Sequence, residues 1–382
     1  MPTQHPPRVA IVGAGTIGTM AAWRLAARGA QVLAFDHFAP GHDRGAAGGE
    51  SRIFRTAYME GRGYIPALRS AAGLWRRLEQ ETGTSLLRMC GAMTIGAPDD
   101  PAMRELRAGA EEHGLDHEVL GPVAAADRYP QHPLRTGETA FLDPAAGVIR
   151  PDLALIAAAR RAAELGAAIA GYTPVTRIEP RGGGWMVSTG DTAHDVDAVV
   201  LAPGAWGAAE GPAHAMLAGF GLVARQITLH WFPARDPGAL TPEHNPVVIR
   251  VGDPAYSCFP VMDGVSVKVS THSAPRPDVG SPDGLARSST PELLAATRAI
   301  VRDHLPALHP DPVRIAAYAD AFTPDGHAVL GALPGSPGLY AAAGFSGHGF
   351  KLSPLFGDAL ADLVVDGATR HDISRLDPAR RL

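Results

Sequence analysis

Residues 9–18 read VAIVGAGTIG, and this stretch decides the fold. Its first four residues are apolar and mostly β-branched, a pattern typical of a buried parallel strand. Gly13, Gly15 and Gly18 then follow with the GxGxxG spacing of a dinucleotide-binding turn. In such a turn the first glycine permits a tight bend, the second lets a pyrophosphate approach the backbone, and the third lets a helix pack closely.

The residues after the turn complete the pattern. Apolar residues recur every fourth position from residue 17 to residue 28, which predicts a helix that Gly29 ends. Residues 31–35 predict a second strand, and Asp36 follows it directly. The order strand, glycine turn, helix, strand and acid indicates a dinucleotide site, because the helix N-terminus faces the phosphates and Asp36 can accept from ribose hydroxyls.

The fingerprint alone does not separate FAD from NAD. Residues 40–50 form a loop rich in glycine, alanine and charge, where a simple NAD domain more often continues into another helix. If residues 51–55 form a helical turn, Arg52 and Arg55 lie on one face and bring two cations to the reactive end of the cofactor. The alternative for this pair is a solvated basic face.

Composition limits the class of protein and its partners. With 382 residues the chain exceeds the roughly 250 to 300 at which single cores stop growing, so we expect two structural domains. A net charge of -5 with 19% charged residues and no basic run argues against a nucleic-acid or polybasic membrane surface and favours a small-molecule partner. Cys90 and Cys258 are too few for a disulfide framework.

The sequence lacks the features of a signal peptide, of a membrane span and of a metal site. Residues 1–8 lack the charged and apolar regions of a signal peptide, and no stretch reaches the ~20 apolar residues of a membrane span. We therefore expect a cytoplasmic protein, either monomer or homodimer, that binds neither nucleic acid nor membrane. We expect no metal, because His113 and His117 have Gly114 between them and no evident third ligand.

The two lysines stand out among the basic residues. Of 34 lysines and arginines only Lys268 and Lys351 are lysine. Lysine is a compact charge whose pKa burial can tune, whereas arginine is a permanently charged planar fork. Either compositional bias left two lysines by accident, or both serve chemistry that needs a small cation.

Three further motifs give the chain a family resemblance. Residues 51–58 read SRIFRTAY, residues 203–206 read PGAW, and residues 344–351 read GFSGHGFK. Together with the glycine turn, these motifs resemble the monomeric sarcosine oxidase and N-methyltryptophan oxidase family, FAD-dependent amine oxidases of the D-amino-acid-oxidase class. The resemblance runs nearly end to end.

The resemblance implies the fold and its division. The expected class is α/β (α+β), with a Rossmann-like FAD-binding domain and a second domain whose antiparallel sheet binds substrate. We expect residues 1–85, 146–215 and 318–382 in the FAD-binding domain, and residues 86–145 and 216–317 in the substrate-binding domain.

The resemblance also implies which residues bind FAD. They come from the glycine turn, the acid after the second strand and the later glycine-rich motifs. The predicted cofactor-binding residues are Gly13, Gly15, Thr16, Ile17, Gly18, Asp36, Ser51, Arg52, Val175, Gly204, Trp206, Gly344, Gly347, His348, Gly349, Phe350 and Lys351.

The predicted catalytic residues are four cations. Lys268 matches the family's lysine near flavin N5, where a cation stabilises the negative charge that develops on O₂. Arg55 and Lys351 match the pair that holds the substrate carboxylate, and two converging cations fix the substrate carbon over the flavin. Arg52, in the same motif, is the fourth.

This chain departs from the family pattern at four positions. Tyr318 lies six residues before Pro324, where the family has its flavin-linking cysteine, so we predict non-covalent FAD. Gly48 replaces a histidine, and Ser257 and Asp320 replace tyrosines, so we expect a roomier pocket. Asp320 either pairs with a second amine of the substrate or is a solvent-facing or capping aspartate. His272 is expected in the same pocket.

The implied reaction is oxidation of a carbon–nitrogen bond in an N-methyl or cyclic amino acid, with an imine and H₂O₂ as products. Three alternatives stay open: a flavin dehydrogenase or demethylase with another electron acceptor, a flavin-binding protein without turnover, and NAD-dependent hydride transfer. A lid or a variable surface loop is expected at residues 274–284, which are rich in proline and glycine.

Overall fold

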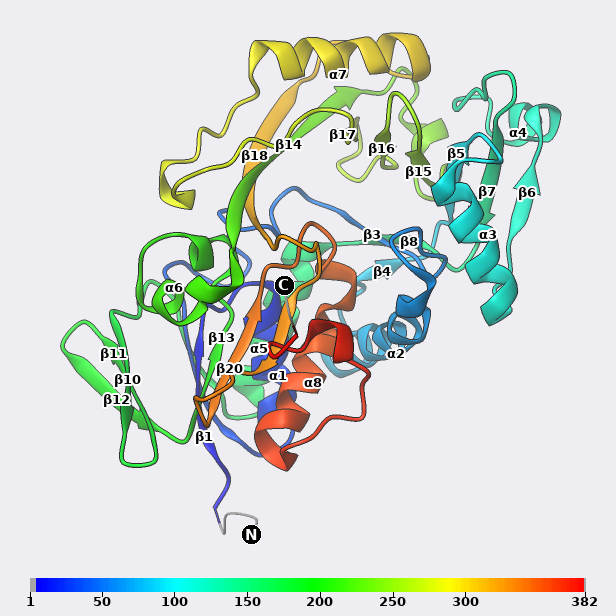
Figure 1. Ribbon diagram of the computed structural model, residues 1–382. Helices are drawn as coiled ribbons and strands as arrows, with labels where there is room; N and C mark the ends of the chain where they lie inside the picture. The colour runs from blue at the N-terminus through cyan, green and yellow to red at the C-terminus, as the bar shows by residue number, and fades with distance from the viewer. Residues whose placement is uncertain (1–4, 381–382) are drawn as a thin grey trace.

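The fingerprint strand lies inside a six-stranded sheet (Figure 1). The computed structural model describes residues 5–380; part of the segment expected to lack a signal peptide, residues 1–4, lies outside them. Four neighbouring pairs are parallel and only the edge strand β19 is antiparallel. The sheet order is β19 (Val329–Ala332), β20 (Leu339–Ala343), β13 (Ala198–Leu201), β1 (Arg8–Val12), β2 (Gln31–Phe35) and β9 (Ala168–Ala170).

Helices cover one face of this sheet. Helix α1 (Thr16–Ala26) follows the glycine turn and packs against α5 (Pro151–Glu164) and α8 (Ser353–Asp366). Arg24 of α1 donates to Asp358 of α8 at 2.7 Å, and both side chains are buried. Burial costs each ion hydration free energy that their mutual pairing offsets. Helix α2 (Ile65–Thr82) packs beside α8 and completes this layer.

The third glycine of the fingerprint has the tightest surroundings. A Cβ at Gly18 would lie 1.8 Å from the carbonyl oxygen of Gly13, whereas a Cβ at Gly15 would have no atom within 4 Å. We expect Gly18→Ala to lower the free energy of unfolding by about 1 to 3 kcal/mol, because the helix must shift away from the strand. Gly15→Ala should change it little. Denaturant unfolding of both variants tests this, and equal destabilisation would contradict it.

The second sheet has eight strands and lies apart from the first sheet, beside helix α7 (Pro291–His304; Figure 1). All its pairs are antiparallel except β15 with β5. Helix α7 covers its outer face, where Ile300 and Val301 join the core of the sheet. The order is β18 (Arg314–Phe322), β14 (Val223–Pro233), β17 (Ser266–Thr271), β16 (Tyr256–Cys258), β15 (Val247–Arg250), β5 (Ala92–Gly96), β7 (Thr139–Asp143) and β6 (Glu118–Leu120).

Two small sheets and three helices complete the fold. One sheet is a meander at the rim, and the other lies near the junction of the two large sheets (Figure 1). The meander contains β10 (Arg177–Arg181), β11 (Gly184–Thr189) and β12 (Thr192–Val196), and the junction sheet contains β3 (Arg52–Phe54), β8 (Gly147–Ile149) and β4 (Leu87–Arg88). The helices are α3 (Pro101–His113), α4 (Pro122–Arg128) and α6 (Pro212–Leu217).

The observed fold confirms the α/β class with a parallel cofactor sheet and a largely antiparallel second sheet. The helical turn considered for residues 51–55 is wrong, because Arg52 begins strand β3 and pairs with Ile149. The domain boundaries stay a prediction; β18 runs across residue 318.

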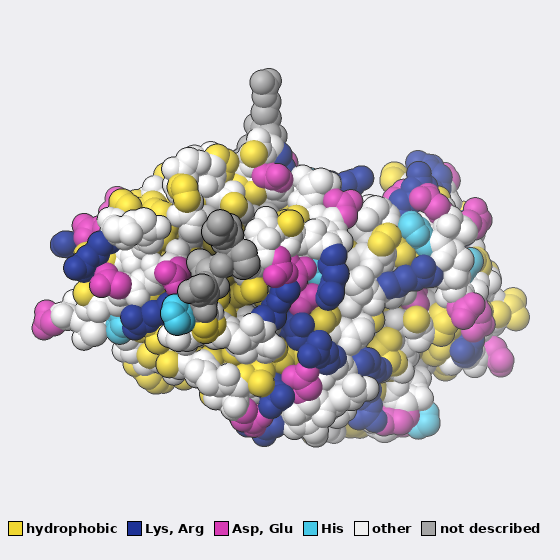
Figure 2. Space-filling view, turned by 90° about the horizontal axis from the view of Figure 1, so that it is seen from below, with side chains coloured by type: hydrophobic (Ala, Val, Ile, Leu, Met, Phe, Trp, Pro, Cys, Tyr) yellow, Lys and Arg dark blue, Asp and Glu magenta, His cyan; other side chains and the backbone are white. Residues whose placement is uncertain are grey.

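Among residues 5–380, no helix has the length and apolar character needed to cross a membrane. On the face seen in Figure 2, basic and acidic side chains are interspersed.

Candidate active site

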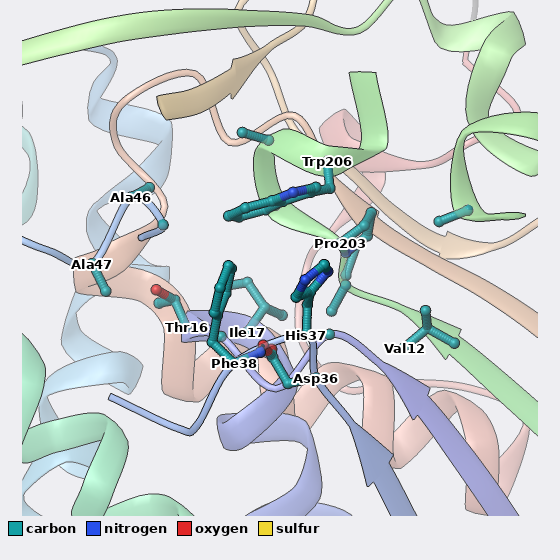
Figure 3. Close-up of a pocket in the computed structure, with 18 of the residues that line it drawn as sticks. Val12, Thr16, Ile17, Asp36, His37, Phe38, Ala46, Ala47, Pro203 and Trp206 are labelled. Carbon is teal, nitrogen blue, oxygen red and sulfur yellow. Dashed lines mark hydrogen bonds between the residues drawn. The ribbon is translucent and has the colours of Figure 1, made fainter. Parts of the chain in front are cut away.

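A cavity of about 360 Å³ opens where β1 and β2 end and α1 begins (Figure 3). Trp206 forms one wall, opposite Thr16 and Ile17. The predicted cofactor-binding residues that line it are Gly13, Gly15, Thr16, Ile17, Asp36, Arg52, Val175, Gly204, Trp206, Gly347, Gly349 and Phe350. Those that do not are Gly18, Ser51, Gly344, His348 and Lys351.

Asp36, which follows strand β2 directly, lines this cavity. Its Oδ2 accepts from the amide of Ala14 and its Oδ1 from the amide of Phe38, each at 2.7 Å. The carboxylate therefore ties the glycine turn to the chain leaving β2. Burial raises the pKa of Asp36, and the two amides oppose that effect.

The sequence prediction missed an aromatic and imidazole wall. His37, Phe38 and His42 line the cavity, and the rings of Phe38 and Trp206 lie 5.8 Å apart. His37 and Phe38 point up toward Trp206 in Figure 3. Their position directly after Asp36 was the available signal, because residues at the carboxyl end of a parallel strand face a ligand crevice.

The loop after β17 closes part of the cavity. We call residues 274–288 the strap. Asp283 of the strap accepts from Trp206 Nε1 at 3.0 Å and lines the cavity, and Arg287 donates to Asp43 at 3.1 Å. Residues 274–284 therefore lie beside this cavity, and Asp283 forms part of its wall. The choice between a lid and a variable loop stays open.

Lys268 is buried at the junction of the two sheets. Its side chain is 2% exposed, and Nζ donates to the carbonyl of Gly49 at 2.8 Å and to that of Ser51. Nζ also lies 3.9 Å from the centre of the Phe259 ring. Burial lowers the pKa of Lys268 well below its usual range, and the nearby charge of Arg52 lowers it further.

A second cationic cluster contains Arg55 and Lys351. Arg55 Nη2 donates to both carboxylate oxygens of Glu60 at 2.7 Å, while its Nε and Nη1 are buried without a partner among the described residues. Lys351 Nζ donates to Tyr58 Oη at 3.3 Å. Burial, with a smaller contribution from Arg55, lowers the pKa of Lys351 to about 8. Unpartnered buried guanidinium donors favour binding of an anion.

Glu60 and Tyr58 were also missed by the sequence prediction. The charges of Arg55 and Lys351 lower the pKa of Glu60 against the effect of burial. Tyr58 is fully buried and lies under both cations, 5.2 Å from the Arg55 carbon Cζ and 4.9 Å from Lys351 Nζ. Tyr58 is the last residue of the motif at residues 51–58, and Glu60 lies two residues after it. This motif was the only feature of the sequence that pointed to them.

Arg52 and Asp320 lie together at the cofactor cavity. Arg52 donates to the carbonyls of Ser51, Ala46 and Gly48, and burial lowers its pKa to about 10. Asp320 lines the same cavity and is partly exposed, and its Oδ1 accepts from the amide of Ala321 at 2.9 Å. Burial raises the pKa of Asp320, which the charge of Arg52 opposes. A contact between Asp320 and a second amine of the substrate stays a prediction.

The space expected at Gly48 is already filled. A Cβ at Gly48 would lie 1.9 Å from Cε1 of Tyr318, so the tyrosine ring occupies the room that a side chain at residue 48 would need. The expected gain of space therefore does not arise there. Gly48 lines a separate, charged cavity of about 380 Å³ instead, together with Arg150 and Arg314.

Ser257 and His272 form a pair. Ser257 Oγ and His272 Nε2 lie 2.8 Å apart. The His272 side chain is partly open to solvent, but the surrounding protein removes much of its hydration. This loss of hydration lowers the pKa of His272 to about 4, and the charges of Arg276 and Arg55 act in the same direction. The imidazole is therefore neutral at neutral pH and can exchange a hydrogen bond with the serine hydroxyl.

Three of the predicted cofactor residues, His348, Gly344 and Ser51, are not among the residues that line the cavity. His348 Nε2 lies 3.0 Å from the carbonyl oxygen of Gly326. Gly344 has a φ of +67°, and a Cβ there would lie 2.5 Å from the Thr323 side chain. Ser51 is buried, and its Oγ has no partner among the described residues.

Comparison with known proteins identifies the family. Residues 8–363 match the family model for FAD dependent oxidoreductases. The chain belongs to this family. It is 32% identical to monomeric sarcosine oxidase of Streptomyces avermitilis over 97% of each chain, and 26% identical to N-methyl-L-tryptophan oxidase of Yersinia pestis over 97% of this chain and 98% of that one. The resemblance inferred from the motifs is thus confirmed.

Solved structures show the same fold. NikD, an amino acid oxidase essential for nikkomycin biosynthesis, matches with a TM-score of 0.85 at 24% identity over 99% of each chain. A glycine oxidase from Geobacillus kaustophilus matches with a TM-score of 0.81 at 23% identity, over 99% of this chain and 100% of that one. The prediction of a sarcosine-oxidase-like, FAD-dependent amine oxidoreductase is confirmed.

The residues at the cavity fit FAD. A Cβ at Gly15 or Gly204 would meet no atom within 4 Å, so both glycines leave open space at the cavity wall. Gly15 precedes the first turn of the 11-residue helix α1, whose free amides attract phosphate. Asp36 at the end of β2 is placed for the ribose.

Proposed function

We propose that this protein is an FAD-dependent oxidase of a secondary or cyclic amino acid that reduces O₂ to H₂O₂. The observation that carries the proposal is the pair of buried, unpartnered donors on Arg55 beside Lys351. The Nε and Nη1 donors of Arg55 are free of partners among the described residues, so they can bind a substrate carboxylate beside the Lys351 cation. FAD, when bound, supplies the electron acceptor for oxidation of the carbon–nitrogen bond.

The remaining groups each support this reaction. Arg55 and Lys351 orient the substrate through its carboxylate, and Tyr58 fixes the Lys351 ammonium. Lys268 supplies a buried cation whose carbonyl contacts hold it in place, which favours reduction of O₂ because negative charge develops on it. A dehydrogenase with a different acceptor has no need of this cation. Cytoplasmic location and a monomer or homodimer stay predictions.

Anaerobic mixing with candidate substrates tests the proposal. Purified, flavin-loaded protein is mixed with a panel of N-methyl and cyclic amino acids, and the visible flavin band is followed. Bleaching by at least one compound, with full recovery and formation of H₂O₂ on admission of air, is the expected result. Bleaching without recovery in air would indicate a dehydrogenase, and no bleaching by any compound would overturn the amino-acid assignment.

We also predict that the flavin is not covalently attached. Tyr318 offers no thiol, and burial raises the pKa of the Cys258 thiol to about 12, which leaves almost no thiolate at neutral pH. Acid precipitation should therefore release all the flavin into the supernatant. Flavin that stays with the precipitated protein of the parent would contradict this, and a Cys258→Ala variant would show whether that thiol is responsible.

A further inference from the structure

Glu50 lies between the two carbonyls that hold the buried Lys268 ammonium. Lys268 Nζ donates to the carbonyl of Gly49 at 2.8 Å and to that of Ser51. In an extended strand, carbonyls two residues apart are separated by about 6.6 Å, whereas one ammonium spans at most about 6 Å with two hydrogen bonds. A turn at Glu50 removes this mismatch, because the amide of Ser51 donates to the carbonyl of Gly49 at 2.7 Å and Glu50 has a φ of +68°.

A glutamate is an unusual residue at the centre of this turn. A three-residue turn with positive φ is strained for any residue with a side chain, and glycine adopts it most easily. The chain has glycine at positions 48 and 49 but glutamate at position 50. Such strain persists only where the surrounding structure holds it in place. The contacts of the Glu50 side chain should therefore explain why glutamate stands there.

The Glu50 side chain is held by the strand that neighbours Lys268. Its Oε2 accepts from Nε1 of Trp231 at 2.8 Å. Trp231 is fully buried on β14 and lies directly opposite Lys268 of β17. Directly opposite residues of neighbouring strands point to the same face of the sheet. Glu50 is thus tied to Lys268 twice, through its own backbone and through the ring of Trp231.

Two other cations lie beside this arrangement. Arg52 Nη1 donates at 2.7 Å to the same Ser51 carbonyl that accepts from Lys268, so two cations share one oxygen. The guanidinium of Arg314, on β18, lies 4.1 Å from the centre of the Trp231 ring. Burial lowers the pKa of Lys268, the charges of Arg52 and Arg314 lower it further, and the charge of Glu50 opposes them.

The two partners differ in their access to water. Lys268 is 2% exposed, whereas Glu50 lines the charged cavity of about 380 Å³. A carboxylate at a polar cavity keeps part of its hydration, so it can serve as a counter-ion at a lower cost than a fully buried one.

We propose that Glu50 is a positioning residue for Lys268: its turn sets two carbonyls around the ammonium, and its carboxylate keeps that nitrogen charged in a buried, cationic place. This inference rests on the proposed function, because it gives Glu50 a part in the reduction of O₂ that Lys268 serves. Removing the carboxylate should then act only through Lys268, and only where the pH allows the ammonium to lose its proton.

The scarcity of lysine allows the charge of Lys268 to be measured directly. Lys268 and Lys351 are the only lysines, so flavin-loaded protein labelled with ¹³C at lysine Cε gives two NMR signals, and Lys268→Gln identifies one of them. Glu50→Gln keeps an acceptor for Trp231 but removes the anion, so the Lys268 signal should titrate at lower pH than in the parent. The Lys351 signal should not move. An unchanged Lys268 midpoint, or a parental Lys268 that carries no charge at any pH, would overturn the inference.

A double-variant cycle tests whether Glu50 acts through Lys268. Flavin is photoreduced in the parent, in Glu50→Gln, in Lys268→Gln and in the double variant, and each is mixed with O₂ over a range of pH. Glu50→Gln should slow the reaction about three- to tenfold between the two Lys268 midpoints and recover at lower pH. In the Lys268→Gln background it should change nothing further. Equal slowing in both backgrounds would contradict the proposal.

Two further variants control for the hydrogen bond and for the turn. Glu81→Gln is the matched control, because Glu81 of α2 accepts from Trp23 Nε1 at 3.0 Å away from Lys268, and it should leave both measurements unchanged. Glu50→Gly suits the positive φ and so keeps the turn without the carboxylate. It should lower the Lys268 midpoint as Glu50→Gln does, and a parental midpoint in Glu50→Gly would count against the carboxylate.

Photoreduction removes the substrate from the experiment, so the proposals can fail separately. If photoreduced parent reacts slowly with O₂ at every pH, the oxidase proposal fails and this inference fails with it. If the parent reacts rapidly and Glu50→Gln behaves identically, the inference alone is wrong. Failure of every amino acid to bleach the flavin would overturn the substrate assignment and would leave the result for Glu50 standing.

Discussion

Replacing Lys268 with methionine should slow the O₂-consuming half of the reaction by about 10²- to 10³-fold, the usual cost of removing one preorganised electrostatic contact. The buried ammonium is held by carbonyls of Gly49 and Ser51 and is almost out of contact with water. A charge in such a place stabilises developing negative charge far better than one in water. Anaerobic bleaching of the flavin by substrate should keep its parental rate, and stopped-flow mixing with O₂ measures the difference.

Lys268→Gln is the matched control for this result. Glutamine keeps N–H donors for the two carbonyls but carries no charge, so it should be nearly as slow as methionine. The pH dependence gives a second check. Because the pKa of Lys268 is lowered by burial, the ammonium is lost as pH rises through that lowered pKa, and the oxygen rate of the parent should fall there. A glutamine variant that reacts with O₂ at the parental rate would exclude a role for the charge.

The cofactor half of the fold could be predicted from the sequence because its signals are local. Strand β2 has the bounds that the apolar run predicted, and the glycine turn lies between β1 and α1 as expected. Each element there is specified by neighbouring residues, namely a run of β-branched side chains, three glycines and one acid. No long-range information was needed to place them.

The junction of the two sheets could not be predicted in the same way. Strand β3 has three residues and exists because Arg52 pairs with Ile149, almost one hundred residues away. A segment so short has no periodicity of its own, so the helical alternative was equally compatible with its sequence. Gly48 and Tyr318 show the same limit, because the loss of one side chain and the gain of another compensate only once the fold brings them together.

Replacing Arg55 with methionine should weaken selection of the substrate carboxylate by about 2 to 5 kcal/mol, or roughly 30- to several-thousand-fold in kcat/KM. The two free donors of Arg55 would be lost, while Glu60 would keep its negative charge beside the site. An amine that lacks a carboxylate should react equally well with parent and variant. Arg62→Met is the matched control, because Arg62 is exposed and pairs with Glu112 at 3.1 Å.

The pH dependence of carboxylate binding distinguishes Lys351 from Arg55. The pKa of Lys351 is about 8, so its cation is present below that pH and is lost as pH rises through it. Binding of a carboxylate ligand should therefore weaken above pH about 8 in the parent. Lys351→Met should bind weakly at every pH and lose this transition. A transition that survives in Lys351→Met would have to come from another group, and the assignment of Lys351 to the carboxylate site would then be wrong.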